Sequence, residues 1–189
     1  MNVFKFLSMG LAAITLCASC SNDDSNPVNE EEVITTFTAT LTGGGQTITL
    51  TSRDLDGAEG PNAPVVTVSG NLATNTTYNG SLTLLNEAAT PTESITEEIL
   101  EEGHEHQFFF TVSNALATTA YAVPNDVNGK PIGLNFTFTT NATTGNGLFT
   151  ITLRHEPNKN AEGVSSGNIT NAGGETDIQV SFPITVVAP

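Results

Sequence analysis

Three histidines are the residues of this chain whose type and spacing best suit specific chemistry. His104 and His106 are two positions apart, so on an extended backbone both side chains project to the same side. His155 ends another segment of alternating apolar residues. Imidazole nitrogens bind Zn²⁺ and Cu²⁺, and a neighbouring carboxylate can add an oxygen ligand. The carboxylates beside these histidines in the sequence are Glu102, Glu105 and Glu156. If the two segments are neighbours, the pattern predicts a Zn²⁺ or Cu²⁺ site formed by His104, His106 and His155.

The histidines also have a purely structural interpretation. His106 shares its parity with Phe108 and Phe110, and His155 shares its parity with Leu153. Side chains that alternate in phase with apolar residues face the core of a sheet protein. His106 and His155 are then hydrogen-bonded residues at the rim of the core, with no ligand at all.

A second candidate site lies in an acidic turn. Asp54 and Asp56 are separated by one residue, Gly57 follows, and Glu59 offers a third carboxylate. Oxygen ligands at such spacing suit Ca²⁺, although the fuller ligand series of an EF-hand is missing. The same residues are typical of an ordinary turn, so a Ca²⁺ site and a plain turn are both open.

The overall composition excludes several classes of function. The chain has 20 Asp and Glu against 5 Lys and Arg, a formal net charge of −15, which opposes binding to the phosphates of nucleic acids. Phosphate-binding loops, Ser/His/Asp arrangements and a cysteine nucleophile in the body of the chain are absent. Trp is absent and Tyr occurs only twice, so there is little aromatic platform for a sugar. We expect no enzymatic activity.

The first twenty residues are typical of a bacterial lipoprotein signal. Lys5 precedes an apolar run, Phe6–Leu16, that is too short to span a bilayer of about 30 Å. Ala18 and Ser19 then lead into Cys20. We expect residues 1–19 to be removed and the thiol of Cys20 to carry lipid. An ordinary secretory signal is the alternative.

The residues after Cys20 indicate where such an anchor is placed. Residues 20–32 are polar and acidic, which predicts a flexible tether. An acidic patch directly after a lipidated cysteine is similar to the export signal of Bacteroidota lipoproteins, which implies the outer face of the outer membrane. A protein facing the periplasm is the alternative. The two cysteines are Cys17 and Cys20, so residues 33–189 must fold without a disulfide.

Residues 33–189 alternate between apolar and polar positions with a period of two. Short alternating runs between turn residues predict an all-β fold, a single antiparallel β-sandwich that is immunoglobulin-like or similar. About nine strands are expected, at residues 36–42, 47–51, 64–69, 77–85, 107–112, 119–123, 133–139, 148–155 and 176–187.

One short helix is expected within this β-rich chain. Ser94 and Glu97 have the spacing of a capping box, in which the Ser94 hydroxyl accepts from the Glu97 amide. Ile95 and Ile99 lie on one face of the turn that follows, and Gly103 is in a position to end it. The sequence therefore predicts a helix over residues 94–102 whose isoleucines pack on the sandwich.

Several stretches together resemble a family of short flavobacterial lipoproteins of unknown function. They are Glu32–Thr36, Arg53–Gly57, Gly60–Pro64, Thr77–Gly80, Leu84–Glu87, His106–Phe110, Leu153–Pro157 and Ile169–Asp177. Such proteins are often labelled "type 1 periplasmic binding fold superfamily", which implies a two-lobed α/β fold. The short alternating strands and the single helix favour a β-sandwich instead. The resemblance implies a location and a shared domain, and it carries over no ligand.

The expected function is that of a lipid-anchored binding or interaction module of the cell envelope, without catalysis. A ligand of such a module would be a protein, a glycan or a metal ion. A metal-binding lipoprotein that uses the histidines is one alternative, and a structural surface component without a specific ligand is another.

Overall fold

The computed structural model describes residues 32–57 and 60–189. The expected signal peptide (1–19), Cys20, the tether up to residue 31, and Glu59 lie outside the described residues. Within the described residues, no helix combines the length and apolar character needed to cross a membrane.

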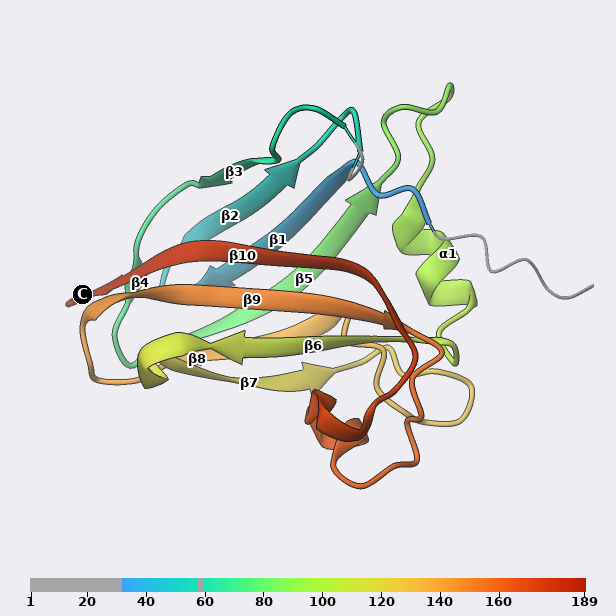
Figure 1. Ribbon diagram of the computed structural model, residues 1–189. Coiled ribbons are helices and arrows are strands. Elements are labelled where there is room, and N and C mark those ends of the chain that lie inside the picture. Colours follow the sequence, from blue (N-terminus) through green and yellow to red (C-terminus); the bar gives the residue numbers. More distant parts are fainter. Residues whose placement is uncertain (1–31, 58–59) are drawn as a thin grey trace, which may run out of the picture. The chain divides into compact units, whose positions relative to one another are not determined.

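Two β-sheets face each other and form a sandwich (Figure 1). The six-stranded sheet has the order β3-β2-β1-β5-β8-β7, and the four-stranded sheet has the order β4-β10-β9-β6. Neighbouring strands are antiparallel except for the short parallel pair β4–β10. The bounds of the six-stranded sheet are β1 (Thr36–Gly43), β2 (Gln46–Arg53), β3 (Val65–Val68), β5 (Thr77–Leu85), β7 (Ala117–Ala122) and β8 (Asn135–Thr140). Those of the four-stranded sheet are β4 (Leu72–Ala73), β6 (His106–Val112), β9 (Gly145–His155) and β10 (Glu175–Val187).

The predicted all-β sandwich with one short helix is confirmed, and each of the nine predicted segments contains a strand. β4 is additional, and β7 begins two residues earlier than expected. The remaining elements are α1 (Ile95–Glu101) and three 3₁₀ turns, η1 (Ser113–Ala115), η2 (Val164–Ser166) and η3 (Ile169–Asn171).

The core lies between the two sheets and is rich in phenylalanine. Phe37 of β1 contacts Phe108 of β6 and Phe182 of β10, with ring centroids 6.2 and 6.1 Å apart. Phe138 meets Phe149 edge-to-face at 4.9 Å. All five rings are buried. Because aromatic burial removes a large apolar area from water, this core can stabilise the domain without disulfides.

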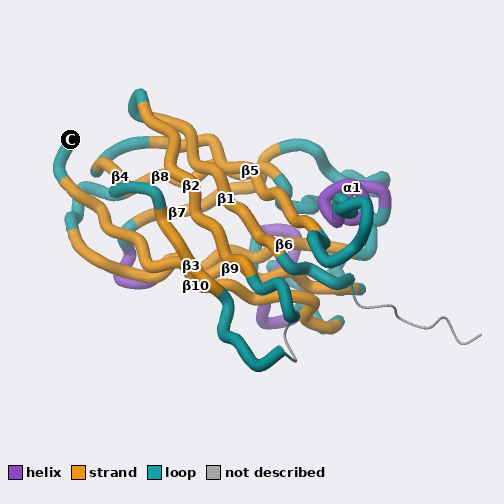
Figure 2. The backbone as a smooth tube through the Cα atoms, turned by 90° about the horizontal axis from the view of Figure 1, so that it is seen from above, coloured by secondary structure: helices purple, strands orange, loops and turns teal. Residues whose placement is uncertain are grey.

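Helix α1 lies at one end of the sandwich (Figures 1 and 2). Ser94 is its N-cap and Ile95 and Ile99 are buried, as predicted. The predicted capping box is wrong, because the Ser94 side chain makes no cap hydrogen bond and the Glu97 amide donates to the Ser94 carbonyl instead. Gly103 follows the C-cap residue, where a Cβ atom would lie 2.4 Å from Ile132. Close packing therefore accounts for this glycine.

Residues 157–174 cover part of the outer face of β6. Phe109 and Gln107 alternate away from the main core, yet both are buried. Phe109 packs with Val164 and Ala172 in a second, smaller cluster. The Gln107 amide donates to the Val164 carbonyl at 2.8 Å. β6 is therefore covered on both faces near its start, which fixes the position of His106.

A β-bulge interrupts the pairing of β9 with β10. Thr176 pairs with Arg154 and Ile178 pairs with Leu153, so the register shifts by one residue at Asp177. An extra residue in one strand shifts the alternation of side chains by one position. In a regular strand Asp177 and the inward-facing Ile178 would point to opposite faces. Because of the bulge, the Asp177 side chain is also buried, with 1% of it exposed.

Candidate metal centre

Four side chains that bear metal-ligand atoms meet at one end of the four-stranded sheet. Each offers one nitrogen or carboxylate oxygen, and these four atoms all lie within 4.8 Å of one another. We call this group the His–carboxylate cluster, and it consists of Glu32, His106, His155 and Asp177. Three strands and the segment before β1 contribute to it, so the cluster depends on the tertiary fold.

The two histidines face each other across the pairing of β6 with β9. His106 and His155 are direct partners in the register. Their rings are stacked, with centroids 4.7 Å apart and an angle of 24° between the ring planes. The His106 side chain is fully buried and that of His155 is 11% exposed. The two segments that carry His106 and His155 are therefore neighbours in the sheet, as the predicted site requires.

Asp177 is brought beneath both histidines by the bulge in β10. Its Oδ2 atom lies 3.9 Å from Nε2 of His106, and its Oδ1 atom lies 3.8 Å from Nδ1 of His155. These separations leave room for an ion between the carboxylate and the two rings. Sequence reasoning missed Asp177, because strict alternation along β10 puts it on the opposite face from Ile178.

Glu32 completes the cluster from the segment that leads into β1. Its Oε1 atom lies 2.7 Å from Nε2 of His106, and only 8% of its side chain is exposed. Its second oxygen, Oε2, is buried and has no hydrogen-bond partner among the described residues. Nδ1 of His155 is likewise buried and has no hydrogen-bond partner among the described residues. Buried polar atoms without protein partners are uncommon in folded proteins, and a bound water or ion is one of the features that satisfy them.

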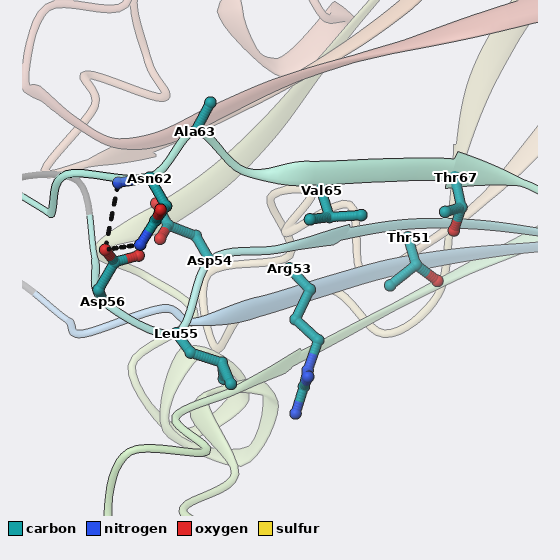
Figure 3. Close-up of a pocket in the computed structure, with 9 residues that line it drawn as sticks. All are labelled: Thr51, Arg53, Asp54, Leu55, Asp56, Asn62, Ala63, Val65 and Thr67. Carbon is teal, nitrogen blue, oxygen red and sulfur yellow. Dashed lines mark hydrogen bonds between the residues drawn. The ribbon is translucent and has the colours of Figure 1, made fainter.

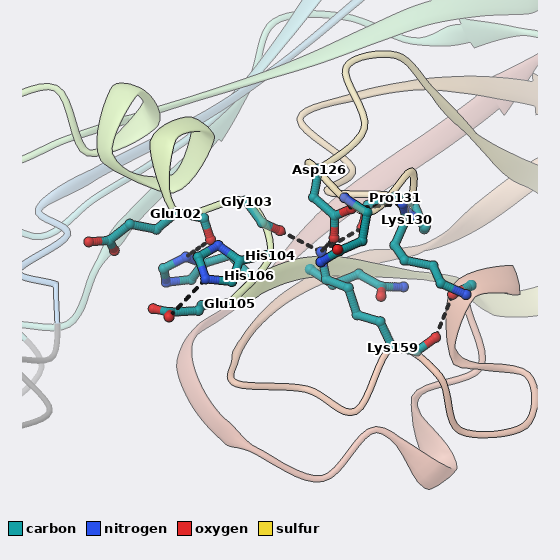
Figure 4. A network of polar contacts seen from close by, with 12 residues as sticks. Glu102, Gly103, His104, Glu105, His106, Asp126, Lys130, Pro131 and Lys159 are labelled. Atoms are coloured by element: carbon teal, nitrogen blue, oxygen red, sulfur yellow. Dashed lines mark hydrogen bonds and ion pairs between the residues drawn. The ribbon is translucent and has the colours of Figure 1, made fainter.

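The second nitrogen of His106 is held by the backbone. Nδ1 lies 3.3 Å from the carbonyl oxygen of Glu102 (Figure 4). A carbonyl only accepts hydrogen bonds, so Nδ1 carries the proton and the lone pair of neutral His106 is on Nε2, which faces the carboxylates. Metal-binding histidines commonly have this arrangement, in which a backbone carbonyl fixes the ring and its tautomer.

The charges in the cluster change the proton affinity of its members. Burial alone would lower the pKa of His106, but Glu32, Asp177 and the Glu102 carbonyl together raise it above its usual value. Burial alone would raise the pKa of Glu32, but the contact with His106 and the nearby His155 lower it. In the absence of a metal, a proton shared by His106 and Glu32 therefore compensates part of the buried negative charge.

His104 does not belong to the cluster. It lies in a turn before β6, its side chain is 49% exposed, and its Nε2 atom lies 3.1 Å from Glu105. The expectation that His104 and His106 face the same side is wrong, because it requires an extended backbone at residue 104. Among the carboxylates suggested as oxygen ligands, the Glu105 side chain contacts His104, and Glu102 contributes its backbone carbonyl. Glu156 has a positive φ of 48° and its amide donates to the Glu105 carbonyl.

The acidic turn after β2 forms a separate group (Figure 3). Oδ2 of Asp56 accepts from the amide and the side chain of Asn62, at 3.2 and 2.8 Å. These contacts lower the pKa of Asp56, which is exposed. Asp54 stands beside them, and Glu59, the third carboxylate of the expected Ca²⁺ site, lies outside the described residues. The contacts of Asp56 are those of a turn.

The donor set of the His–carboxylate cluster decides which ions it suits. Two nitrogens and two carboxylate oxygens are typical of Zn²⁺ and other divalent transition metals, whereas Ca²⁺ prefers oxygen alone. With both rings neutral, the two carboxylates carry a charge of −2, which a divalent ion neutralises. Tetrahedral Zn²⁺ requires ligand atoms about 3.3 Å apart. Small rotations of the four side chains would therefore be enough to close around the ion.

Comparisons with known proteins find no match for this chain. No protein-family model matches the chain, no curated protein matches it, and no solved structure matches it.

Proposed function

We propose that this protein is a non-catalytic binding module of the cell envelope whose ligand is a divalent transition-metal ion, with Zn²⁺ as the first choice and Cu²⁺ as its competitor. The ion is held by Nε2 of His106, Nδ1 of His155 and one oxygen each of Glu32 and Asp177. The proposal keeps two of the histidines expected from the sequence and replaces His104 by two carboxylates.

One observation carries the proposal: Nε2 of His106, fully buried, faces two carboxylates while the Glu102 carbonyl fixes the other nitrogen. A purely structural histidine would need only one partner. Two carboxylates beside one buried imidazole bring negative charges close together, and this arrangement favours a bound cation. A divalent ion compensates both at once.

Thermal unfolding of the chelator-treated protein, repeated with Zn²⁺, Cu²⁺ or Ca²⁺, tests the proposal. A ligand that binds only the folded state stabilises it by about 2.7 kcal/mol at a hundredfold excess over its dissociation constant. For a domain of this size, that free energy corresponds to an increase in Tm of about 5 to 10 °C. We expect this increase with Zn²⁺ or Cu²⁺ and none with Ca²⁺.

The chain offers a matched control for the ligand assignment. Asp177→Asn keeps the shape of the side chain but removes a charge, and we expect it to abolish most of the increase with Zn²⁺. His106→Gln should do the same. His104→Ala removes an exposed histidine two residues away and should leave the increase unchanged. An increase that survives Asp177→Asn, or one that disappears in His104→Ala, would refute the assignment.

We also propose that the domain is attached to the outer membrane through lipid on Cys20 and is exposed at the cell surface. The apolar run before Cys20 and the acidic residues after it support this proposal. Cys20→Ala should abolish metabolic labelling with a radioactive fatty acid and release the protein from the membrane fraction. Labelling that persists in Cys20→Ala would refute lipidation at this residue. Digestion of intact cells by an added protease tests surface exposure, and protection of the protein would favour the periplasmic side.

A further inference from the structure

A groove of about 1040 Å³ opens on the side of the sandwich where β3 and β10 lie. Its walls are the segment 32–35, residues 54, 56–57 and 60–64 with Val66 of β3, and residues 176–181 of β10. Inward-facing apolar side chains, such as Phe37 and Val180, form its floor. The volume is at the upper end of the range of about 300 to 1000 Å³ that is usual for ligand pockets.

The groove is bordered by a short edge strand whose side chains carry no charge. β3 is the outermost strand of the six-stranded sheet, and Val65 and Val66 are 64% and 38% exposed. Val66 lines the groove, while Val65 is on the opposite face of the strand. β3 contains no charged residue, and an exposed apolar edge of this kind is a template for another strand.

The backbone of Val66 is directed away from β2. The Ser69 amide donates to the Thr49 carbonyl, so this pair is a hydrogen-bonded pair of the antiparallel ladder. Hydrogen-bonded and non-hydrogen-bonded pairs alternate, so Thr67 and Val65 bond to β2, while the N–H and C=O groups of Val66 point outward. A peptide strand that runs along the edge of β3 would find these two groups available.

The charges on the groove are all of one sign. The charged residues that line it are Asp54 and Asp56, together with Glu32 and Asp177 of the His–carboxylate cluster, and no Lys, Arg or His of the described chain is among them. With an ion bound at the cluster, Asp54 and Asp56 are the carboxylates left to attract a ligand. The nearest cation in sequence, Arg53, is bonded to Glu87 instead. Potentials at binding surfaces are complementary, so the groove favours a cationic occupant.

We propose that the groove binds an extended peptide segment of another protein, in which basic residues alternate with apolar ones. The peptide backbone adds to the edge of β3 at Val66, its apolar side chains enter the groove, and its basic side chains meet Asp54 and Asp56. The tether of this chain is itself acidic, and a second copy would bring the same carboxylates together, so charge disfavours both as occupants.

Fluorescence anisotropy with a labelled peptide of eight alternating valines and lysines tests the proposal. A second peptide with glutamate in place of lysine tests the charge, and a third with N-methylated backbone amides tests strand addition without any change to the protein. We expect saturable binding of the lysine peptide alone, weakened by salt. No binding of the lysine peptide, or equal binding of all three peptides, would overturn the proposal.

Two variants of the protein locate the site. Val66→Pro removes the outward N–H group and should weaken binding about tenfold, since the pairing with β2 does not use that group. Asp54→Asn should weaken binding about fivefold, while Glu162→Gln, the same change of charge on an exposed loop, should not. Thermal unfolding checks that each variant is folded, and the N-methylated peptide gives an independent answer if Val66→Pro is not.

The groove and the His–carboxylate cluster can be tested separately. His106→Gln should abolish the stabilisation by Zn²⁺ and leave binding of the lysine peptide within about twofold. Val66→Pro should weaken binding of the lysine peptide and leave the stabilisation by Zn²⁺ unchanged. Analytical ultracentrifugation of the protein alone tests whether a second copy of the chain occupies the groove. A concentration-dependent dimer that Val66→Pro abolishes would replace the peptide by a second copy and overturn the proposal.

Discussion

Replacement of the buried Lys159 by methionine should destabilise the domain strongly. Lys159 is 6% exposed, and its ammonium group donates to the carbonyls of Gly103 and Pro131 and to Oδ2 of Asp126 (Figure 4). The Asp126 side chain is 1% exposed. Removal of the cation leaves that carboxylate buried without its counter-charge, which costs about 3 to 5 kcal/mol when one partner of a buried pair is lost. This is a large part of the total stability of about 5 to 15 kcal/mol that is usual for a domain.

Urea denaturation of four proteins measures this effect: the parent, Lys159→Met, Asp126→Asn and the double variant. Burial lowers the pKa of Lys159 while Asp126 opposes this effect, so the two charges depend on each other. We expect the double variant to lose about 2 kcal/mol less than the sum of the single variants. Lys130→Met is the matched control, because Lys130 is only partly buried, and we expect a change within about 0.5 kcal/mol.

The same substitution should also weaken the proposed binding of Zn²⁺ at the His–carboxylate cluster. Lys159 holds the Gly103 carbonyl, which follows directly on the Glu102 carbonyl that orients His106. We therefore expect weaker Zn²⁺ binding in Lys159→Met than in Lys130→Met under conditions in which both are folded. The reasoning is refuted if Lys159→Met loses less than about 1 kcal/mol, or if the double variant loses the full sum.

Two further predictions concern pH and core packing. The raised pKa of His106 means that its contact with Glu32 stabilises the metal-free protein fully below the usual histidine pKa of 6.5, and that this stability is lost as pH rises through the raised pKa. The lowered pKa of Glu32 means that its contribution is present above 4.5 and is lost as pH falls through the lowered pKa. Urea midpoints from pH 4 to 9 should therefore decline above about pH 6.5 in the metal-free protein and much less in Glu32→Gln, and equal slopes would contradict the pair. In Gly80→Ala the new Cβ would lie 2.4 Å from the buried ring of Phe136, so we expect a loss of about 1 to 3 kcal/mol in the same assay, and a loss below about 0.5 kcal/mol would show that the ring moves aside.

Alternation in the sequence predicts nine of the ten strands in the described residues, because each of them has an apolar face and turn residues separate them, whereas the two residues of β4 are too few to show a period. It also correctly placed His106 and His155 in phase with the inward residues of β6 and β9. It could not show that β6 and β9 pair, because the order of strands in a sandwich is decided by packing over the whole chain. The direct pairing of the two histidines is a property of the register.

The two carboxylates of the cluster were not predicted, for different physical reasons. Asp177 is turned inward by a one-residue bulge, and the residue types near Thr176 do not predict a bulge at that position. Glu32 ends an acidic run that has the composition of a solvated tether, yet its side chain is buried against His106. His104 was predicted to join the site and does not, since residue 104 lies in a turn and lacks the extended backbone on which the prediction depended.

The position of Glu32 has a mechanical consequence for the proposed attachment of the domain through Cys20. Tension along that segment reaches the carboxylate of Glu32 first and the backbone hydrogen bonds of Thr35 next. It then enters β1, which has β2 on one side and β5 on the other. A pull along a central strand shears the hydrogen bonds of both neighbours at once, whereas a pull on an edge strand opens them on one side only. If the domain is anchored through Cys20 as proposed, the load would therefore enter a strand with a neighbour on each side, and movement of the anchoring surface would not peel the sheet apart from its edge.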